Sequence, residues 1–494
     1  MCKKASIAFS VIFFNFLQVV NVAYAANESI TLKAQTQPNI LLIIADDAGY
    51  QDFGFQGSKV MKTPELDKLA EQSVQFSQAY VSAAVCGPSR AGLFTGKYQQ
   101  RFGFEENNVP GYMSSAGLLA DDMGLPVDQL TMADHLKSLG YQTALIGKWH
   151  QGSADRFHPL KRGFDSFYGF RSGARSYFSY DNQGIEYSKH DRLERNFAEF
   201  EEPKKYLTDL FADETSAVIE LQAKQSAPFF TVLSFSAVHT PMEAKSEDLA
   251  MFDHLSARRK SLAAMNFAMD RAVGQVLDKL NQLKIADKTL VVFMNDNGGP
   301  TDLSSANNHP LSGTKASHFE GGIRIPFLMR WPDKLTALSH YQQPISTLDL
   351  LPTFYQAAGG KLATLEEIDG VDLLPFLTAK TQVSATDNQS STHIKIQTRP
   401  HQNLYWKKEN RGAIRSGDWK LMRFPDRPAE LFNLANDPSE LNNLASQQPD
   451  KVKLLYKALF QWELGLERPS WQLKRKFEGA AMERMDKFRI HQAQ

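Results

Sequence analysis

Four short apolar runs constrain the fold of this chain most strongly, because each is uninterrupted and each leads into polar or charged residues. Continuous apolar runs of this length are typical of strands that are buried on both faces of a parallel sheet. The runs occupy residues 39–45, 143–147, 228–235 and 290–294. The polar residues that follow them are Asp46 and Asp47, Lys148 and His150, His239, and Asp296 and Asn297.

Helical patterns separate these runs. Thr63 and Pro64 are expected to cap and begin a helix with an apolar face, and residues 134–139 and 257–283 also have helical periodicity. Alternating strands and helices predict an α/β fold, a large and mostly parallel sheet sandwiched by helices. Ligands of such folds bind at the carboxyl ends of the strands, where the polar residues gather.

The pattern changes after about residue 375. Residues 380–391 are polar and predict a linker or surface loop, followed by antiparallel strands around residues 405–406, 413–415 and 419–422 and a helix over 451–464. No structure is predicted for the charged tail from Glu467. We expect a main domain over residues 37–375 and a smaller C-terminal subdomain with an antiparallel sheet over 376–494.

The composition excludes several classes of protein. The 494 residues include 55 Lys and Arg against 55 Asp and Glu, and 42% are hydrophobic. A disordered chain, a collagen-like repeat and a strongly basic nucleic-acid binder are all inconsistent with these values. The chain is long enough for one large α/β domain with a smaller companion.

The first 25 residues are typical of a signal peptide. Two lysines precede the apolar run 7–20, and small residues at 23 and 25 place the cleavage site after Ala25. The alternative, a membrane anchor, is disfavoured because the run is short for a bilayer span. We therefore expect an exported protein, periplasmic or secreted, with no stable membrane anchor. Removal of Cys2 leaves Cys86 alone, so an intramolecular disulfide is excluded.

Asp46, Asp47, Asp296 and Asn297 predict a metal site. Two carboxylates about 4 Å apart repel by roughly 4 kcal/mol at an effective dielectric constant near 20, and a divalent cation reverses that effect. Because the candidate ligands are oxygen atoms, they favour Ca²⁺ or Mg²⁺ over Zn²⁺. The alternative role for each aspartate alone is a helix cap or turn residue.

Cys86 lies in the sequence Cys-Gly-Pro-Ser-Arg at residues 86–90. Pro88 suits the first turn of a helix, which would place Cys86 at a helix N-terminus, where backbone N–H groups attract anions. Arg90 adds a cation whose planar fork fits a tetrahedral oxyanion.

This motif and its neighbours resemble those of type I sulfatases of the alkaline phosphatase-like superfamily. Cys-x-Pro-Ser-Arg is the signature at which maturation enzymes oxidise cysteine to formylglycine. Further matching segments follow in the family's order over about residues 37–445. They include residues 38–50, 147–150, 239–241, 295–298, 313–326, 369–375 and 417–421.

The resemblance implies a sulfuric ester hydrolase with a formylglycine (3-oxoalanine) at Cys86. The implied Ca²⁺ ligands are Asp46, Asp47, Asp296, Asn297 and the modified Cys86, with Mg²⁺ the less favoured ion. Arg90 and Lys148 would stabilise the aldehyde hydrate that attacks sulfur, and His239 and Lys315 would bind the sulfate and assist the leaving alcohol. His150 would take a proton when the sulfated hemiacetal collapses. A formylglycine-generating enzyme is the implied maturation partner.

An exported sulfatase of this kind implies a sulfated poly- or oligosaccharide as substrate, with a role in polysaccharide degradation. Arginines alternate with aromatic residues over residues 156–177, and Arg171 is a candidate substrate contact. The alternative is that this stretch packs on the sheet. His309 and His318 flank Lys315 as further candidate contacts, or as ordinary loop histidines.

Two other functions stay open at this point. One is a formylglycine-dependent phosphoesterase or phosphonate hydrolase of the same superfamily, although the His-rich clusters of two-metal members are not found in the sequence. The other is a non-catalytic secreted protein that binds sulfated glycans and in which Cys86 is never modified. Rates on an aryl sulfate and an aryl phosphate would distinguish a sulfatase from a phosphoesterase. The mass of the peptide around residue 86 would test whether the protein is a non-catalytic binder with an unmodified cysteine.

Overall fold

The computed structural model describes residues 37–180, 189–365, 367–378 and 399–489. Within these ranges the largest sheet has ten strands in the order β13-β2-β12-β10-β1-β9-β5-β6-β7-β8. Its five central strands are parallel, which confirms the predicted core of the fold. They are β10 (Thr289–Asn295), β1 (Asn39–Ala45), β9 (Phe229–Ser234), β5 (Gln142–Lys148) and β6 (Ser166–Phe170).

The outer strands of this sheet were not predicted and are mostly antiparallel to their neighbours. They are too short to give a periodic pattern of their own, and only pairing with the central strands defines them. On one side lie β12 (Phe327–Arg330), β2 (Val74–Phe76) and β13 (Ser339–Tyr341), and on the other β7 (Glu194–Arg195) and β8 (Ala198–Glu199).

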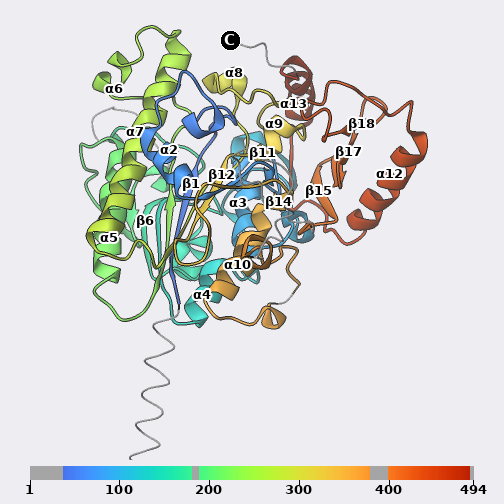
Figure 1. Ribbon diagram of the computed structural model, residues 1–494. Helices are drawn as coiled ribbons and strands as arrows, with labels where there is room; N and C mark the ends of the chain where they lie inside the picture. Colours follow the sequence, from blue (N-terminus) through green and yellow to red (C-terminus); the bar gives the residue numbers. More distant parts are fainter. Residues whose placement is uncertain (1–36, 181–188, 366, 379–398, 490–494) are drawn as a thin grey trace, which may run out of the picture.

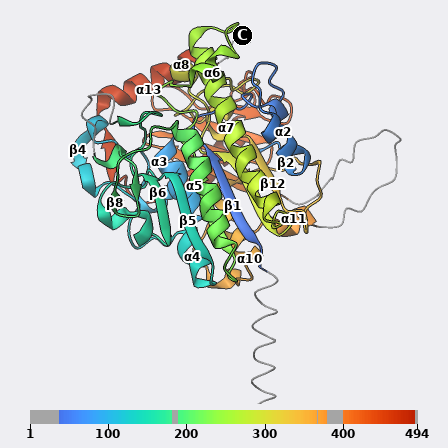
Figure 2. The same ribbon diagram turned by 90° about the vertical axis from the view of Figure 1, so that its left-hand side faces the viewer.

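Helices cover both faces of the sheet (Figure 1), as the continuous apolar strands predict. One face carries α2 (Pro64–Glu71), α5 (Leu207–Gln222) and α7 (Ala257–Gln282), with α5 and α7 side by side in Figure 2. The other carries α3 (Cys86–Thr95), α4 (Met132–Ser138) and α10 (Leu350–Ala357). Alternate residues of β1 enter the two cores, Ile40 and Leu42 on one side and Leu41 and Ile43 on the other.

Helix α2 begins at Pro64 as predicted, but its cap differs from the expectation. The hydroxyl of Thr63 accepts the N–H of Gly54 at 2.7 Å and makes no capping bond. Instead, Asp270 of α7 accepts the backbone N–H groups of Glu65 and Leu66 at 3.1 and 2.8 Å. A distant carboxylate therefore takes the place of the local cap, and sequence alone gives no sign of it.

The C-terminal region contains the expected antiparallel sheet, with one strand more than predicted. Its strands are β15 (Asn403–Lys408), β16 (Arg411–Ser416), β17 (Trp419–Arg423) and β18 (Glu430–Asn433), in that order. One face of this sheet, including Trp406, packs into the core of the large domain, and the other packs on α12 (Pro449–Glu463), as Figure 1 shows.

Residues after Glu467 contain ordered elements that were not predicted. Strand β19 (Trp471–Leu473) pairs with β4 (Met113–Gly117), and helix α13 (Arg475–Lys487) follows. The predicted signal peptide and the predicted linker at 380–391 lie outside the described residues. In the described part of the chain, no helix is long and apolar enough to span a membrane.

The remaining elements are short. A small sheet has the order β11 (Arg324–Ile325), β3 (Ala79–Tyr80) and β14 (Ile345–Ser346). The short helices are α6 (Ser246–Ala250), α8 (Thr301–Ser304), α9 (Glu320–Ile323) and α11 (Leu374–Thr378). Residues 296–323, which connect β10 to β11 through α8 and α9, pass over the carboxyl edge of the sheet and carry Lys315.

Candidate active site

The four predicted strands are neighbours in the sheet, so their carboxyl ends deliver their polar residues to one place. Asp46 and Asp47 follow β1, and Asp296 and Asn297 follow β10. Lys148 is the last residue of β5, and His239 lies in the turn after β9. These side chains are buried, apart from the slightly exposed His239. The order of strands thereby explains why residues so far apart in sequence meet.

Four side chains at this edge could share one cation. Asp46, Asp47, Cys86 and His239 each offer a ligand atom, and these atoms all lie within 4.8 Å of one another. The Sγ of Cys86 lies 3.7 Å from Oδ1 of Asp46, and Nε2 of His239 lies 3.5 Å from Oδ2 of Asp47. So many donor atoms in so small a volume are typical of a metal site.

Asp296 and Asn297 supply the oxygen atoms that a hard cation requires. Oδ1 of Asp296 and Oδ1 of Asn297 are both buried, and neither has a hydrogen-bond partner within the described residues. The amide of Asn297 donates to Oδ1 of Asp47 at 2.6 Å, which holds the two residues together. Since unpaired buried oxygens are costly, their presence beside two carboxylates fits a site for an oxygen-binding divalent ion.

Three cationic side chains balance the carboxylates. Nζ of Lys315 lies 2.6 Å from Asp47 and 3.0 Å from the Sγ of Cys86. Nζ of Lys148 contacts Asp46, and Nε of Arg90 donates to Asp296 at 2.8 Å. With Lys148 and Arg90 fully buried, this charge lies in a low-dielectric setting, where its interaction with an anionic group is strong.

Cys86 is the first residue of helix α3, as predicted from Pro88, and Arg90 lies one turn later. Backbone N–H groups at this helix end favour negative charge at position 86. Nη1 of Arg90 donates to Oγ of Ser234 at 2.6 Å and to the carbonyl of Lys148 at 3.2 Å. These bonds to the ends of β9 and β5 fix the guanidinium beside the carboxylates, and Ser234 is a supporting residue that the sequence did not indicate.

Burial and charge shift the pKa values of the site residues in different directions. Burial alone would raise the pKa of the Cys86 thiol, but Lys148 and Lys315 lower that pKa to about 7. Burial and the surrounding cations, Lys148 first, hold the pKa of His150 well below its usual range. Burial would also lower the pKa of His239, yet Asp47 raises it above the usual value. The site therefore holds an acidic thiol, a neutral imidazole and a more basic one.

His150 adopts an unusual backbone conformation, with a φ of 58°. It lies two residues beyond the end of β5, and both ring nitrogens are buried without a hydrogen-bond partner in the described residues. A Cβ at Gly173 would lie only 2.6 Å from Nε2 of His150, so the ring packs where only glycine fits. A strained residue with unpaired ring nitrogens is typical of a functional position.

The loop that carries Lys315 is held from outside by helix α13. Arg484 pairs with both carboxylate oxygens of Asp302 at 2.6 and 2.7 Å, and its Nη1 donates to the carbonyl of Lys315 at 3.2 Å. The carbonyl of Arg489 accepts the N–H of Gly313 at 3.1 Å. Sequence reasoning missed these supports because the tail gave no pattern that links it to residue 315.

Two of the three further candidate contacts are buried next to other charged groups. Arg171 is buried, and its guanidinium is bound to both carboxylate oxygens of Glu194, at 2.6 and 2.9 Å, and to Asp155. Its charge is already neutralised by these carboxylates, and the assignment of Arg171 as a substrate contact stays a prediction. His318 is buried beside Arg411 and Lys420, and burial holds its pKa well below the usual range. Its assignment as a substrate contact stays a prediction. His309 is exposed on the same loop and stays a prediction.

The aromatic residues of the 156–177 stretch pack on the sheet, which was the alternative to a sugar-binding surface. Phe164, Phe167, Phe170 and Tyr177 are buried in the two large cores. Arg175 is paired with Glu202 at 2.7 Å. The alternation of arginine and aromatic residues here stabilises the fold.

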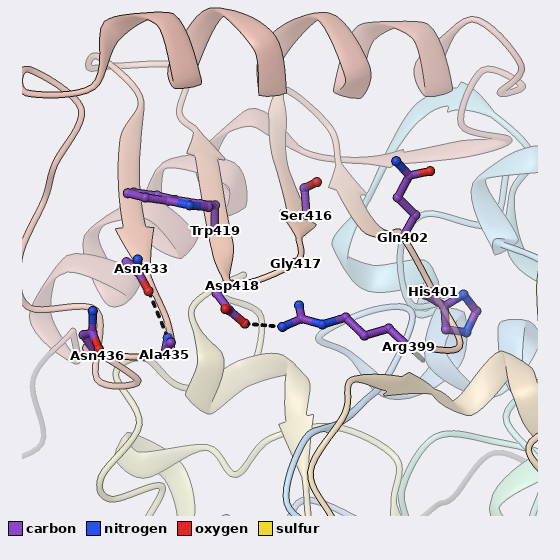
Figure 3. Close-up of a pocket in the computed structure, with 10 residues that line it drawn as sticks. All are labelled: Arg399, His401, Gln402, Ser416, Gly417, Asp418, Trp419, Asn433, Ala435 and Asn436. Carbon is purple, nitrogen blue, oxygen red and sulfur yellow. Dashed lines mark hydrogen bonds and ion pairs between the residues drawn. The ribbon is translucent and has the colours of Figure 1, made fainter. Parts of the chain in front are cut away.

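A cavity of about 600 Å³ in the C-terminal sheet contains none of the predicted site residues (Figure 3). Trp419, Asn433 and Asn436 line one side, and Arg399 and Asp418 form an ion pair at 2.7 Å on the other. This pairing neutralises the two charged groups drawn toward each other in Figure 3.

Comparison with protein families finds two matching models. Residues 38–360 match the model described as "Sulfatase", and residues 314–462 match that of the "N-sulphoglucosamine sulphohydrolase, C-terminal" region. The first match covers all the site residues from Asp46 to Lys315. The residues of β19 and α13 lie beyond both matches.

Curated proteins similar to the chain include the N-acetylgalactosamine-6-sulfatase of Mus musculus, 34% identical over 357 residues, which are 70% of this chain and 67% of that protein. The steryl-sulfatase of Homo sapiens is 31% identical over 428 residues, 71% of each chain. Among solved structures, Ps i-CgsB in complex with k-i-k-neocarrahexaose has a TM-score of 0.79 and 35% identity, covering 90% of this chain and 97% of that chain.

Proposed function

Because this chain belongs to the sulfatase family and is an enzyme that hydrolyses sulfate esters, we propose that its substrate is a sulfated oligo- or polysaccharide and that Cys86 acts as a formylglycine. One relative is named as an N-acetylgalactosamine-6-sulfatase, and the solved structure of Ps i-CgsB is a complex with the oligosaccharide k-i-k-neocarrahexaose. Both names support a carbohydrate as the substrate. That hexasaccharide is the first substrate to test.

The observation that carries the proposal is the setting of Cys86. It is the first residue of α3, 3.0 Å from Nζ of Lys315 and 3.7 Å from Asp46, in a ring of cations that fits one tetrahedral anion. A hydrated aldehyde at this position supplies a nucleophilic oxygen and a second hydroxyl that allows sulfate release, which a thiol lacks. We therefore propose that a formylglycine-generating enzyme acts on Cys86 before the sulfatase is active.

The same residues would hold one divalent cation. Asp46, Asp47, Asp296, Asn297 and the modified residue 86 offer oxygen atoms, and a nearly all-protein ligand set fits Ca²⁺ better than Mg²⁺, which retains several waters. A bound cation would withdraw electron density from the sulfate oxygens and favour ionisation of the nucleophile. Two of these oxygen atoms have no other partner in the described chain, which supports the assignment.

The remaining side chains have separate tasks. Lys148 and Arg90 stabilise negative charge at residue 86, because both are buried and fixed by carboxylates. Lys315 and His239 bind the sulfate, and the raised pKa of His239 suits donation of a proton to the leaving alcohol. His150 has a lowered pKa, so it is neutral and able to accept the proton that accompanies sulfate release.

Calcium dependence is tested by dialysis of the matured enzyme against a chelator. Activity on an aryl sulfate is expected to fall and to return with Ca²⁺, and the melting temperature is expected to rise with the Ca²⁺ concentration, because a ligand that binds only the folded state stabilises it. A melting temperature and an activity that ignore both treatments would remove the metal from the proposal.

Substrate class is tested with matched esters. The proposal predicts that an aryl sulfate is hydrolysed much faster than the corresponding aryl phosphate, because the ring of cations and one metal suits a singly charged ester. Faster hydrolysis of the phosphate would favour a phosphoesterase. We further propose export to the periplasm or beyond, which N-terminal sequencing of the mature protein from the native cell tests.

A further inference from the structure

A cavity of about 580 Å³ lies next to the loop that carries Lys315. Its walls come from the turn at residues 57–60, the start of α7, the residues around α8, and the end of α13. Both α8 and α13 lie at the top of the molecule in Figures 1 and 2. None of the residues that line this cavity takes part in the proposed catalytic mechanism.

Three of the lining residues tie the cavity to the catalytic edge. Gln51 follows Asp47 by four residues, which limits their separation along the chain to about 14 Å. The N–H of Gln51 donates to the carbonyl of Asn307 at 2.9 Å. The N–H of Thr301 donates to the hydroxyl of Thr314, the neighbour of Lys315, at 3.0 Å. The cavity thus adjoins the loops that bear the metal ligands and the sulfate-binding lysine.

The cavity has an excess of positive charge. Lys59 and Lys487 line it, and no carboxylate of the described chain lies within ion-pair distance of either. The nearby carboxylates are bound to other cations. Their pairs are Asp52 with Arg259, Asp253 with Lys260, Asp302 with Arg484, and Asp486 with Arg427.

The same cavity offers neutral hydrogen-bond donors. Oγ1 of Thr301 is buried and has no hydrogen-bond partner in the described residues. The side-chain amides of Gln51 and Asn307 also line the cavity, where that of Asn307 donates to Oε1 of Gln51 at 3.1 Å. Lysine ammonium groups together with hydroxyl and amide donors match the oxygen atoms of a sulfate ester. An apolar or cationic ligand would use none of these donors.

We propose that this cavity is an anion-binding subsite, which holds a sulfate group of the substrate chain on a sugar other than the one being desulfated. The proposal rests on the proposed carbohydrate substrate and extends it, since it selects chains that carry more than one sulfate group. A small aryl sulfate fills only the catalytic site, so its hydrolysis does not depend on Lys59 or Lys487.

The test compares two double variants that remove the same charge. Lys59→Ala with Lys487→Ala changes the cavity, and Lys288→Ala with Lys334→Ala changes two exposed lysines at the opposite edge of the sheet, before β10 and after β12. Low-molecular-mass dextran sulfate is the probe, with unsulfated dextran as its control. Binding is measured on the full-length matured enzyme, together with inhibition of 4-nitrophenyl sulfate hydrolysis.

The cavity variant is expected to bind dextran sulfate about tenfold more weakly than wild type, and its inhibition constant is expected to rise by the same factor. The control variant is expected to match wild type, and kcat and KM for 4-nitrophenyl sulfate are expected to be unchanged in both. Equal affinities in the two double variants, or no binding by wild type, would overturn the subsite. Binding and hydrolysis are measured separately, so the two proposals can fail separately. If wild type hydrolyses no sulfated sugar, that result contradicts the proposed function and not the subsite.

Discussion

Two groups of buried charged side chains lie at the ends of the segment from Lys315 to Glu320, and they differ in how well they are paired. At the catalytic edge, Oδ1 of Asp296, Oδ1 of Asn297 and both ring nitrogens of His150 have no hydrogen-bond partner within the described residues. Around Glu320, by contrast, both oxygens of Glu320 and one oxygen of Glu440 accept hydrogen bonds, and the other oxygen of Glu440 forms an ion pair with Lys420 at 2.8 Å. Buried polar atoms without partners are therefore typical of a group that binds a ligand, whereas fully paired charges are typical of a group that joins two parts of the fold.

The group around Glu320 joins the C-terminal sheet to the large domain. Nζ of Lys420 lies 2.9 Å from Glu320 and 2.8 Å from Glu440, and the hydroxyl of Tyr80 donates to Glu320 at 2.6 Å. The N–H of Glu320 donates to the second oxygen of Glu440 at 2.7 Å, and Arg415 contacts the hydroxyl of Tyr80. Both carboxylates and Lys420 are fully buried and paired with one another, so the group joins the two parts of the fold.

The largest effect is expected at position 86. Cys86→Ala removes the residue proposed to become the nucleophile, and kcat for an aryl sulfate should fall at least about 10³-fold with little change in melting temperature. Ser216→Ala, a buried hydroxyl without a partner in the described chain, is the matched control and should keep full activity. Retention of activity in Cys86→Ala would contradict the catalytic role of this edge.

The opposite pattern is expected for Lys420. Lys420→Met leaves buried Glu440 without its cation and Glu320 with only Arg324, at 3.5 Å, so the free energy of unfolding should fall by about 3–5 kcal/mol while kcat of the folded enzyme is retained. Denaturant unfolding and kcat at low temperature measure the two quantities, with exposed Lys361→Met as the control. A loss of kcat without a loss of stability would mean that the two groups are not separate.

A smaller effect on catalysis is expected at Arg484, which contacts the carbonyl of Lys315. Arg484→Gln loosens the loop and should lower kcat about tenfold, because displacement of a catalytic group weakens transition-state contacts more than binding of the ground state. Arg484→Lys should restore part of the loss. Arg475→Gln, on the same helix but with a side chain 92% exposed, should behave as wild type. If kcat were unchanged in Arg484→Gln, α13 would have no part in positioning Lys315.

The smallest effect concerns pH. Burial raises the pKa of Glu440 from 4.5 to about 7 despite the opposing effect of Lys420. The folded state then binds this proton more tightly than the unfolded state, so stability falls as the pH rises from about 4.5 to 7, by at most about 1.4 kcal/mol per pH unit. Glu440→Gln removes this contribution, and unfolding curves across that range should show a flatter dependence. An unchanged slope would contradict the raised pKa.

The sequence predicted the part of the molecule that depends on local pattern. The apolar runs of β1, β5, β9 and β10 identified four adjacent strands, and the helix that begins at Cys86 followed from Pro88. Because parallel strands end at one edge, the carboxylates and lysines that follow them could be assigned to one site before the structure was known.

The parts that sequence did not predict depend on long-range contacts. Asp270 caps a helix about 200 residues away, and Arg484 supports Lys315 from a tail with no clear pattern. Arg171 had the right chemistry for a sulfate contact, yet Glu194 neutralises it. In each case the role of a charged group is decided by its partner in space, which neither composition nor periodicity reveals.

The central claim is that residue 86 of the working enzyme is an aldehyde. Mass spectrometry of the peptide that contains residue 86 tests this claim directly. The enzyme is expressed together with the maturation enzyme, purified and first shown to hydrolyse an aryl sulfate. The account predicts the mass of formylglycine or its hydrate in proportion to specific activity. A fully active preparation that carries only unmodified cysteine at this position would contradict it.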